Sequence, residues 1–303
     1  MSTQGPDRRQ LANAITLLSA SVWGLYWIPV RHVSEHFLSG AWGALSLVLV
    51  GAALLLPFAL RNRARLQAAS PSALVSIALG GAAIGLYAVG LLYGQVAIVV
   101  LLFYLSPVWS TLIGRLWLGW PTPWMRYLSI AVGLAGLLLV LGADGAWPMP
   151  RQLGDWLGLS GGLLWAVAST GIRTRNRLGV GETTFVGALG GTAATILVLA
   201  LADPARPELP MIEEWVAIAV WVIGAAGLWW GGATAGILWA ASQLEPARLG
   251  VLLMSEALVG VISAALFAGE HLRIVEICGG TLILLAAILE VWPVRSAERF
   301  AAS

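Results

Sequence analysis

Charge is scarce in this chain. Only 11% of its 303 residues are Asp, Glu, Lys or Arg, whereas about 25% is usual in a soluble domain. Hydrophobic residues make up 59% of the sequence, and the mean hydropathy is +0.85. So few charges cannot cover a surface that faces water. We therefore predict an all-α integral membrane protein whose solvent is the lipid bilayer.

Lysine is absent, and cysteine and histidine are rare. All 17 basic residues are arginines that lie between apolar runs, so nucleic acid is not an expected partner. The one cysteine, Cys278, cannot form an intrachain disulfide. The sequence shows no His/Cys cluster at metal-ligand spacing, no phosphate-binding loop and no soluble domain large enough for an ATPase. We predict no metal and no other cofactor.

One short motif raises the question of catalysis. "GLSGG" at 158–162 fits the G-x-S-x-G nucleophile elbow, but a nucleophilic serine needs a base within hydrogen-bond reach. The three histidines, His32, His36 and His271, all fall in or beside predicted external loops. We therefore predict that the protein is not an enzyme.

Apolar runs divide the chain into stretches of the length that spans a bilayer, about 20 residues. Arg8 and Arg9 precede the first run, but that run is as long as a span and lacks a small-x-small cleavage site, so no signal peptide is predicted. We expect ten spans: Leu11–Val30, Leu38–Leu60, two within Leu66–Gly114 broken near Gly94-Gln95, Tyr127–Ala143, Trp156–Ile172, Thr183–Ala202, Trp215–Leu244, Leu249–Gly269 and Ile274–Leu289.

The arginines also predict the orientation. Thirteen fall on the side of the N-terminus and four on the other side, namely Arg31, Arg151, Arg206 and Arg273. Cytoplasmic loops carry the excess of positive charge. Both termini should therefore be cytoplasmic.

The two halves of the chain resemble each other. "WGLYWIPVR" at 23–31 lies over "WAVASTGIR" at 165–173, "GGAAIG" at 80–85 over "GGATAG" at 231–236, and "LWLG" at 116–119 over "LFAG" at 266–269. Chance likeness among Gly/Ala-rich helices is the alternative. We predict two inverted five-helix repeats around a central cavity, at 1–143 and 154–293, followed by a cytoplasmic tail at 294–303.

Glu256 is the strongest candidate for function, because a carboxylate in mid-span is costly unless it is paired, protonated or facing water. A structural, protonated carboxyl is the alternative. Glu276 lies near a helix end and is assigned a structural role. Arg31 and Arg173 end their helices on opposite faces and either meet substrate carboxylates or, the interpretation that we favour, position the helices.

Large aromatic side chains stand at helical spacing near the ends and middles of several spans. Together with Glu256 they make a candidate substrate site, and plain packing between helices is the alternative for each. The candidates are Trp23, Tyr26, Trp27, Tyr87, Tyr104, Trp165 and Trp239.

Glycines recur at a spacing of four, which lets helices approach closely in lipid. We expect close helix packing at the pairs Gly81/Gly85, Gly90/Gly94, Gly187/Gly191, Gly227/Gly231 and Gly232/Gly236.

These features together resemble the drug/metabolite transporter superfamily of EamA type. The resemblance is carried by "SVWGLYW" at 21–27, "LSPVWSTLIGRLWLG" at 105–119 and "LFAGEHL" at 266–272. The chain departs from the pattern at Trp120, where the L-G-E element expects Glu, and at Glu256-Ala257, whose counterpart is Ser106-Pro107.

The many tryptophans resemble the YddG-type branch, the exporters of aromatic and hydrophobic amino acids. The resemblance implies a bacterial inner-membrane exporter that works by alternating access. Glu256 would receive the ammonium of an amino acid and the aromatic rings its side chain. The alternative is export of other small metabolites or cationic drugs, with possible proton coupling through Glu256. The lipid bilayer is the other partner, and the oligomeric state, monomer included, is left open.

Overall fold

The computed structural model describes residues 6–116, 124–143, 145, 147, 149–202, 210–241, 244 and 246–291, and its regular elements there are all helical. The predicted tail at 294–303 and Trp120 lie outside these residues. The elements are α1 (Pro6–Gly24), α2 (Trp27–His36), α3 (Ala41–Arg61), α4 (Arg63–Ala68), α5 (Pro71–Tyr93), α6 (Val96–Phe103), α7 (Ser106–Leu116), α8 (Trp124–Leu141), α9 (Leu153–Arg175), α10 (Val180–Ala202), η1 (Ile212–Glu214), α11 (Trp215–Ala225), η2 (Ala226–Ala233), α12 (Thr234–Ala241), α13 (Pro246–Phe267) and α14 (Ile274–Val291).

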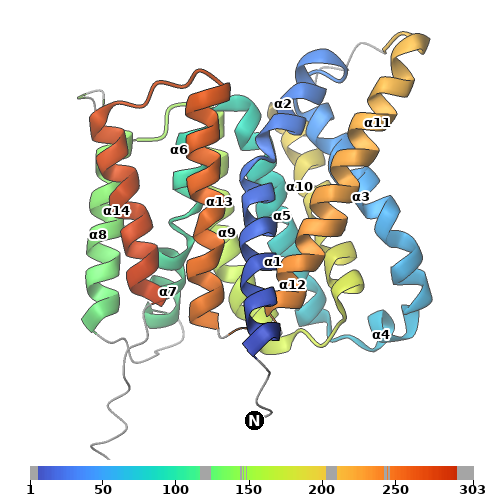
Figure 1. Cartoon of the computed structure of the whole chain (residues 1–303), viewed down its shortest axis with the longest axis horizontal. Helices are drawn as coiled ribbons and strands as arrows, with labels where there is room; N and C mark the ends of the chain where they lie inside the picture. Colours follow the sequence, from blue (N-terminus) through green and yellow to red (C-terminus); the bar gives the residue numbers. More distant parts are fainter. Residues whose placement is uncertain are drawn as a thin grey trace, which may run out of the picture.

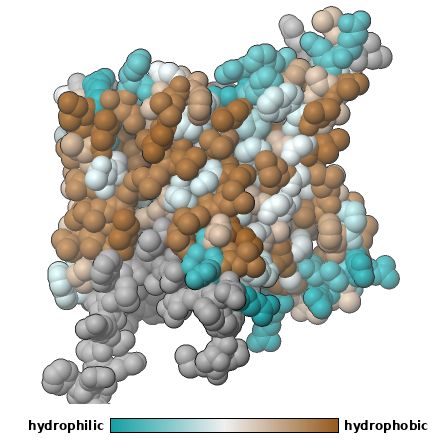
Figure 2. All heavy atoms as spheres, viewed as in Figure 1, coloured by the Kyte–Doolittle hydropathy of each residue, from teal (hydrophilic) through white to brown (hydrophobic). Residues whose placement is uncertain are grey.

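Many large apolar side chains are exposed on the outside of the helices, and on the face in Figure 2 they form an apolar band. Figure 2 shows it as a brown belt with hydrophilic residues above it and at its lower right. Within the described residues, six helical stretches are long and apolar enough to cross a membrane, namely 10–36, 41–61, 71–93, 96–113, 180–202 and 215–240. Apolar side chains facing outward in the middle of the molecule require a hydrocarbon solvent. The chain is a multi-pass membrane protein.

The helices stand side by side and run alternately up and down (Figure 1). In the first half, α1 and α2 rise from the end that holds the N-terminus, α3 descends, α5 rises, α6 and α7 descend, and α8 rises. In the second half, α9 descends, α10 rises, the run from α11 through η2 to α12 descends, α13 rises, and α14 descends.

One helix break agrees with the sequence, and two others were not predicted. The predicted break at Gly94-Gln95 is confirmed, since α5 ends at Tyr93 and α6 begins at Val96. The expected single helix Leu11–Val30 is instead α1 and α2 with a turn between them, and α2 continues to His36. Another turn separates α6 from α7. Pro29 and Pro107 lie in the first turns of α2 and α7, where proline is favoured because its missing N–H has no helical partner.

The expected helix Trp215–Leu244 also differs from a plain α-helix. Its middle, η2, is a π-helix of 8 residues that contains Trp229 and Trp230. π segments are rare and occur often at functional sites.

Glycine lets the central helices touch along their backbones. α5 packs against both α9 and α10, and a Cβ added at Gly85 would lie 2.7 Å from the carbonyl oxygen of Gly191. Gly81 and Gly187 approach even more closely, so the glycine prediction is confirmed for this helix pair. It is wrong for Gly227 and Gly231, where an added Cβ would meet nothing within 4 Å.

Candidate functional site

Glu256 faces the inside of the helix bundle. The lipid-facing side of α13 carries Leu258 and Ile262, which are 49% and 56% exposed. At 100° per residue, Leu258 lies roughly 160° and Ile262 roughly 120° around the helix axis from Glu256. Glu256 is half-buried. Glu256 therefore does not lie on the side of α13 that carries the exposed Leu258 and Ile262.

Two tyrosines lie close to this carboxyl. The Tyr104 hydroxyl is within hydrogen-bonding reach of Glu256, and it donates to the carbonyl oxygen of Leu253 at 3.0 Å. Tyr87 is close enough to Glu256 for the two side chains to interact electrostatically. Because the Tyr104 hydroxyl has one proton and two acceptors on α13, it can serve Glu256 or Leu253, but not both at once.

Aromatic rings extend the site away from the carboxyl. The Phe103 ring lies between Tyr87 and Trp165, with ring centroids 4.8 Å and 6.5 Å away. The end of α6 reaches α9 because Gly162 leaves room for it: a Cβ there would lie 2.6 Å from the Phe103 carbonyl oxygen. Of the sequence candidates, the structure thus brings together Tyr87, Tyr104, Trp165 and Glu256, and it adds Phe103, which sequence reasoning missed.

The "GLSGG" segment serves this packing. Gly158, Gly161 and Gly162 all face backbone of other helices at 2.6–3.0 Å from an added Cβ. Ser160 is exposed and donates to the Trp156 carbonyl oxygen of its own helix at 2.7 Å. Among the described residues, the Ser160 hydroxyl bonds carbonyl oxygens of its own helix and no histidine.

Trp23 and Tyr26 belong to a second aromatic cluster. They lie 5.0 Å apart, and their partners are the η2 tryptophans. Trp230 donates to the Tyr26 hydroxyl at 3.3 Å, and Trp229 donates to the Val22 carbonyl oxygen at 2.7 Å. This cluster fastens the turn between α1 and α2 to the π-helix. The sequence offered only the paired tryptophans of "LWWGG" at 228–232 as a signal for it.

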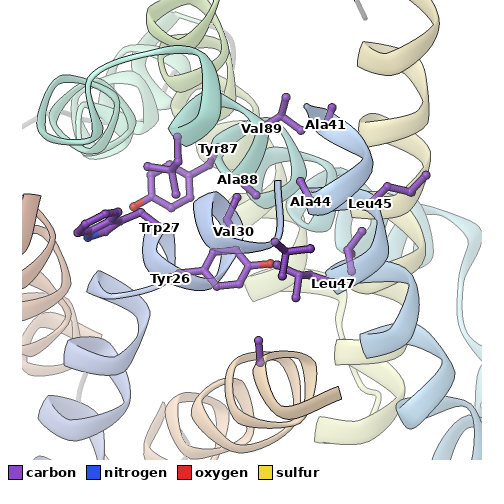
Figure 3. Close-up of a cluster of buried hydrophobic side chains, with 14 of the residues drawn as sticks. Tyr26, Trp27, Val30, Ala41, Ala44, Leu45, Leu47, Tyr87, Ala88 and Val89 are labelled. Carbon is purple, nitrogen blue, oxygen red and sulfur yellow. The ribbon is translucent and has the colours of Figure 1, made fainter. Parts of the chain in front are cut away.

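Trp27 and Trp239 occupy separate places. Trp27 is buried and donates from its indole N–H to the Ser263 hydroxyl at 2.9 Å. Figure 3 shows Tyr87 pointing toward Trp27 and Tyr26 extending toward Leu47. Trp239 packs beside a small core that consists of Ala12, Ala240 and Leu244, with Leu252 next to it. Leu252 precedes Glu256 by one turn of α13.

Arg31 caps the C-terminal end of α5. It donates to the carbonyl oxygens of Leu91 and Gly94, both at 2.9 Å, at the C-terminal end of α5. This geometry satisfies carbonyl groups that have no partner within their own helix. Glu276 likewise accepts the backbone N–H of Arg273 at 2.7 Å, at the start of α14. Both residues are used structurally, as predicted.

Two hollows are found outside this site. One is an apolar groove on α11 between Trp215 and Gly224. The other has a volume of about 620 Å³ and is lined by Arg65, Ser70 and Arg177. Neither borders Glu256. At the centre, the buried Trp23, Tyr26 and Tyr87 rings fill much of the space between the helices, and the central cavity stays a prediction.

The comparisons with known proteins agree with this class of helical membrane protein. Residues 10–142 match the model of the EamA-like transporter family. A solved structure titled "Crystal structure of protein" is similar to this chain, with a TM-score of 0.55 and 18% identity, over 92% of this chain and 97% of that chain. At this identity the likeness concerns the fold alone. A comparison with curated proteins finds no match.

Proposed function

We propose that the chain is an EamA-type transporter that works by alternating access. Ten spans would form two inverted five-helix repeats, 1–143 and 154–293, with both termini in the cytoplasm of a bacterial cell. The family match over residues 10–142 supports the assignment to transporters. The opposite directions of α1 and α9, the first helices of the two halves, support the inversion (Figure 1).

Helix contacts between the halves also support the repeat. If each helix of the first half is exchanged for its counterpart, the contacts map onto one another. α5 packs on α9, and the counterpart pair, α12 and α1, is also in contact. α13 packs on α1, and its counterpart pair, α6 and α9, is in contact as well. α3 packs on α10 and α8 on α14, which are each other's counterparts. Such a two-fold relation is the usual basis for rocking between two access states.

The substrate we propose is an amino acid with an aromatic or other hydrophobic side chain, exported from the cytoplasm. One observation carries this proposal: a half-buried carboxyl, Glu256, lies beside Tyr104 and Tyr87 deep in an apolar bundle. The carboxylate suits an ammonium group. The rings of Phe103 and Trp165 suit an apolar side chain, and an aromatic face attracts a cation by about 1–2 kcal/mol when water is excluded.

A second candidate substrate is a lipophilic cation. It is favoured by the absence, among the described side chains, of an arginine that contacts Glu256 or the rings beside it. A zwitterionic amino acid needs a partner for its carboxylate as well as for its ammonium, whereas a cation needs only the first.

The test is uptake into liposomes that contain the purified protein. Labelled phenylalanine, leucine, glycine and tetraphenylphosphonium are compared for the wild type, Glu256→Gln and the control Glu213→Gln, whose side chain is exposed. Phenylalanine uptake that is lost in Glu256→Gln and kept in Glu213→Gln supports the amino-acid proposal. Uptake of tetraphenylphosphonium alone favours the cation. Equal rates for wild type and Glu256→Gln with every substrate would refute the site.

A further inference from the structure

An ion pair between the two halves of the chain holds the turn between α5 and α6. Arg31 of α2 and Glu270, which lies between α13 and α14, are 3.3 Å apart, and their side chains are 21% and 9% exposed. Arg31 also stands over the Trp27 ring at 5.6 Å. α2 and the connection between α13 and α14, which carry the two residues, lie at the end of the bundle opposite the N-terminus (Figure 1). This is the outer end in the proposed orientation.

Glu270 supplies the N-terminal cap of α6. It accepts the backbone N–H groups of Val96 and Ala97 at 2.8 Å and 3.1 Å. The residue in the local capping position, Gln95, makes no side-chain bond of this kind. A carboxylate is favourable there because the N-terminal end of a helix carries partial positive charge. The other half of the chain therefore determines where α6 begins.

The opposite end of α6 reaches the candidate site. α6 has 8 residues, about 12 Å of helix, and its side chains from Val96 to Leu102 are all buried. Phe103 ends it, and Tyr104 then donates to α13. A short, enclosed helix moves as one piece, so a displacement at Tyr104 is transmitted to the Glu270 cap.

We propose that Arg31 and Glu270 form a latch that closes the outer end of the transport pathway, and that α6 couples the latch to the substrate site. This inference rests on the proposed transport function. A substrate ammonium that binds Glu256 enters beside Tyr104, and the Tyr104 end of α6 shifts to admit it. The N–H groups of Val96 and Ala97 then leave Glu270, and the ion pair loses the geometry that the cap maintains.

The repeat does not reproduce the acid of this latch. The position that corresponds to Glu270 in the first repeat is Trp120, at an offset of 150 residues. An indole cannot form an ion pair. The proposed latch therefore has no charged copy at the repeat-related position. The end that holds the N-terminus, where α4 lies (Figure 1), carries a different ion pair between the halves, Arg65 with Glu182 at 3.9 Å.

The test measures access from outside and needs no transport. Ser263 lies on α13 between the latch and Glu256 and is 4% exposed. In a Cys278→Ser background, Ser263→Cys is labelled with a membrane-impermeant maleimide in right-side-out vesicles. The cysteine sulfur remains a weak acceptor for the Trp27 indole N–H that Ser263 accepts, and every labelling rate is compared within this same background. The variants are Glu270→Gln, Glu270→Ala and Arg31→Gln. Glu35→Gln is the matched control, because Glu35 is an exposed carboxylate of the same α2 helix.

We expect labelling to be about tenfold faster in each latch variant, a typical size for coupling between sites, and unchanged in Glu35→Gln. The double variant Arg31→Gln/Glu270→Gln should be labelled no faster than the faster single variant. Added phenylalanine should speed labelling in the chain with an intact latch and not in the latch variants. Labelling at the control rate in all three latch variants overturns the latch. A phenylalanine effect that persists in Glu270→Gln overturns the coupling through α6.

Failure of the latch and failure of the proposed function are distinguishable. Faster labelling of the latch variants supports the latch even if no tested amino acid is transported. Conversely, phenylalanine transport that depends on Glu256 upholds the function even if all labelling rates are equal. Thermal unfolding of each variant is measured alongside. Glu270→Gln, which is isosteric, changes the second half of the chain, whereas Arg31→Gln changes the first half, so misfolding of one variant does not decide the result.

Discussion

Gly24 offers a sharp test of the packing around Glu256, because α1 meets α13 at this residue. A Cβ added at Gly24 would lie 2.5 Å from the Glu256 carbonyl oxygen, 2.9 Å from the Val259 Cβ and 3.0 Å from the Gly260 nitrogen. Carbon–oxygen contacts normally begin at about 3.3 Å. Two of these three atoms belong to helix backbone and cannot rotate away. In Gly24→Ala, α1 must therefore move away from α13 by nearly 1 Å.

Two opposing terms determine the size of the effect. Inserting a methyl group into a packed interface costs about 1–3 kcal/mol, and replacing glycine with alanine in a helix contributes about 0.4–1 kcal/mol of stability through the unfolded chain. We expect Gly24→Ala to lower the free energy of unfolding by about 1–2 kcal/mol. The control is Gly224→Ala, where an added Cβ meets nothing within 4 Å and only the favourable term applies.

The assay is thermal unfolding in detergent, followed by intrinsic fluorescence of the 16 tryptophans. The midpoint should fall for Gly24→Ala and stay or rise for Gly224→Ala. If both variants shift in the same direction, the close approach of α1 to α13 is refuted, and with it the environment described for Glu256.

Three further changes test the site. Ser263→Ala leaves the buried Trp27 indole N–H without its partner and should lower the free energy of unfolding by about 1–3 kcal/mol, measured by the same unfolding assay. Trp165→Leu should raise the KM for phenylalanine about 5- to 30-fold, the equivalent of 1–2 kcal/mol, whereas Trp156→Leu, on the lipid-facing side of the same helix, should leave it unchanged; equal KM values would remove Trp165 from the site. Tyr104→Phe should slow transport while it lowers the free energy of unfolding by no more than about 1 kcal/mol, and a normal transport rate would exclude the hydroxyl from the mechanism.

Much of the fold was predictable because lipid imposes a simple rule on hydropathy. The all-helical class and the break at Gly94-Gln95 follow from run length and turn residues. The turn before Ser106-Pro107 was less accessible. Only the structure shows that the helix breaks there, whereas the repeat-related Glu256-Ala257 lies inside the continuous helix α13.

Helix faces were harder to assign than helices. In a membrane the side that meets lipid and the side that meets protein are both apolar, so composition does not separate them. Gly227 and Gly231 have the same spacing as Gly187 and Gly191, yet only the second pair lies against another helix. Trp229 and Trp230 were missed for the same reason, since their contacts with Val22 and Tyr26 join segments that are 207 and 204 residues apart.

The placement of α6 has a mechanical consequence for any motion of this bundle. α6 belongs to the first half by sequence, but both of its ends are bonded to residues of the second half. Glu270 accepts the N–H groups at its start, and the Leu253 carbonyl oxygen accepts the hydroxyl of Tyr104 at its end. In the same way α13, a helix of the second half, packs on α1 of the first half. In the proposed alternating access, the bodies that move against each other would therefore not be the N-terminal and C-terminal halves of the polypeptide. Each would include a helix from the other half, and the chain would cross between the two bodies more than once.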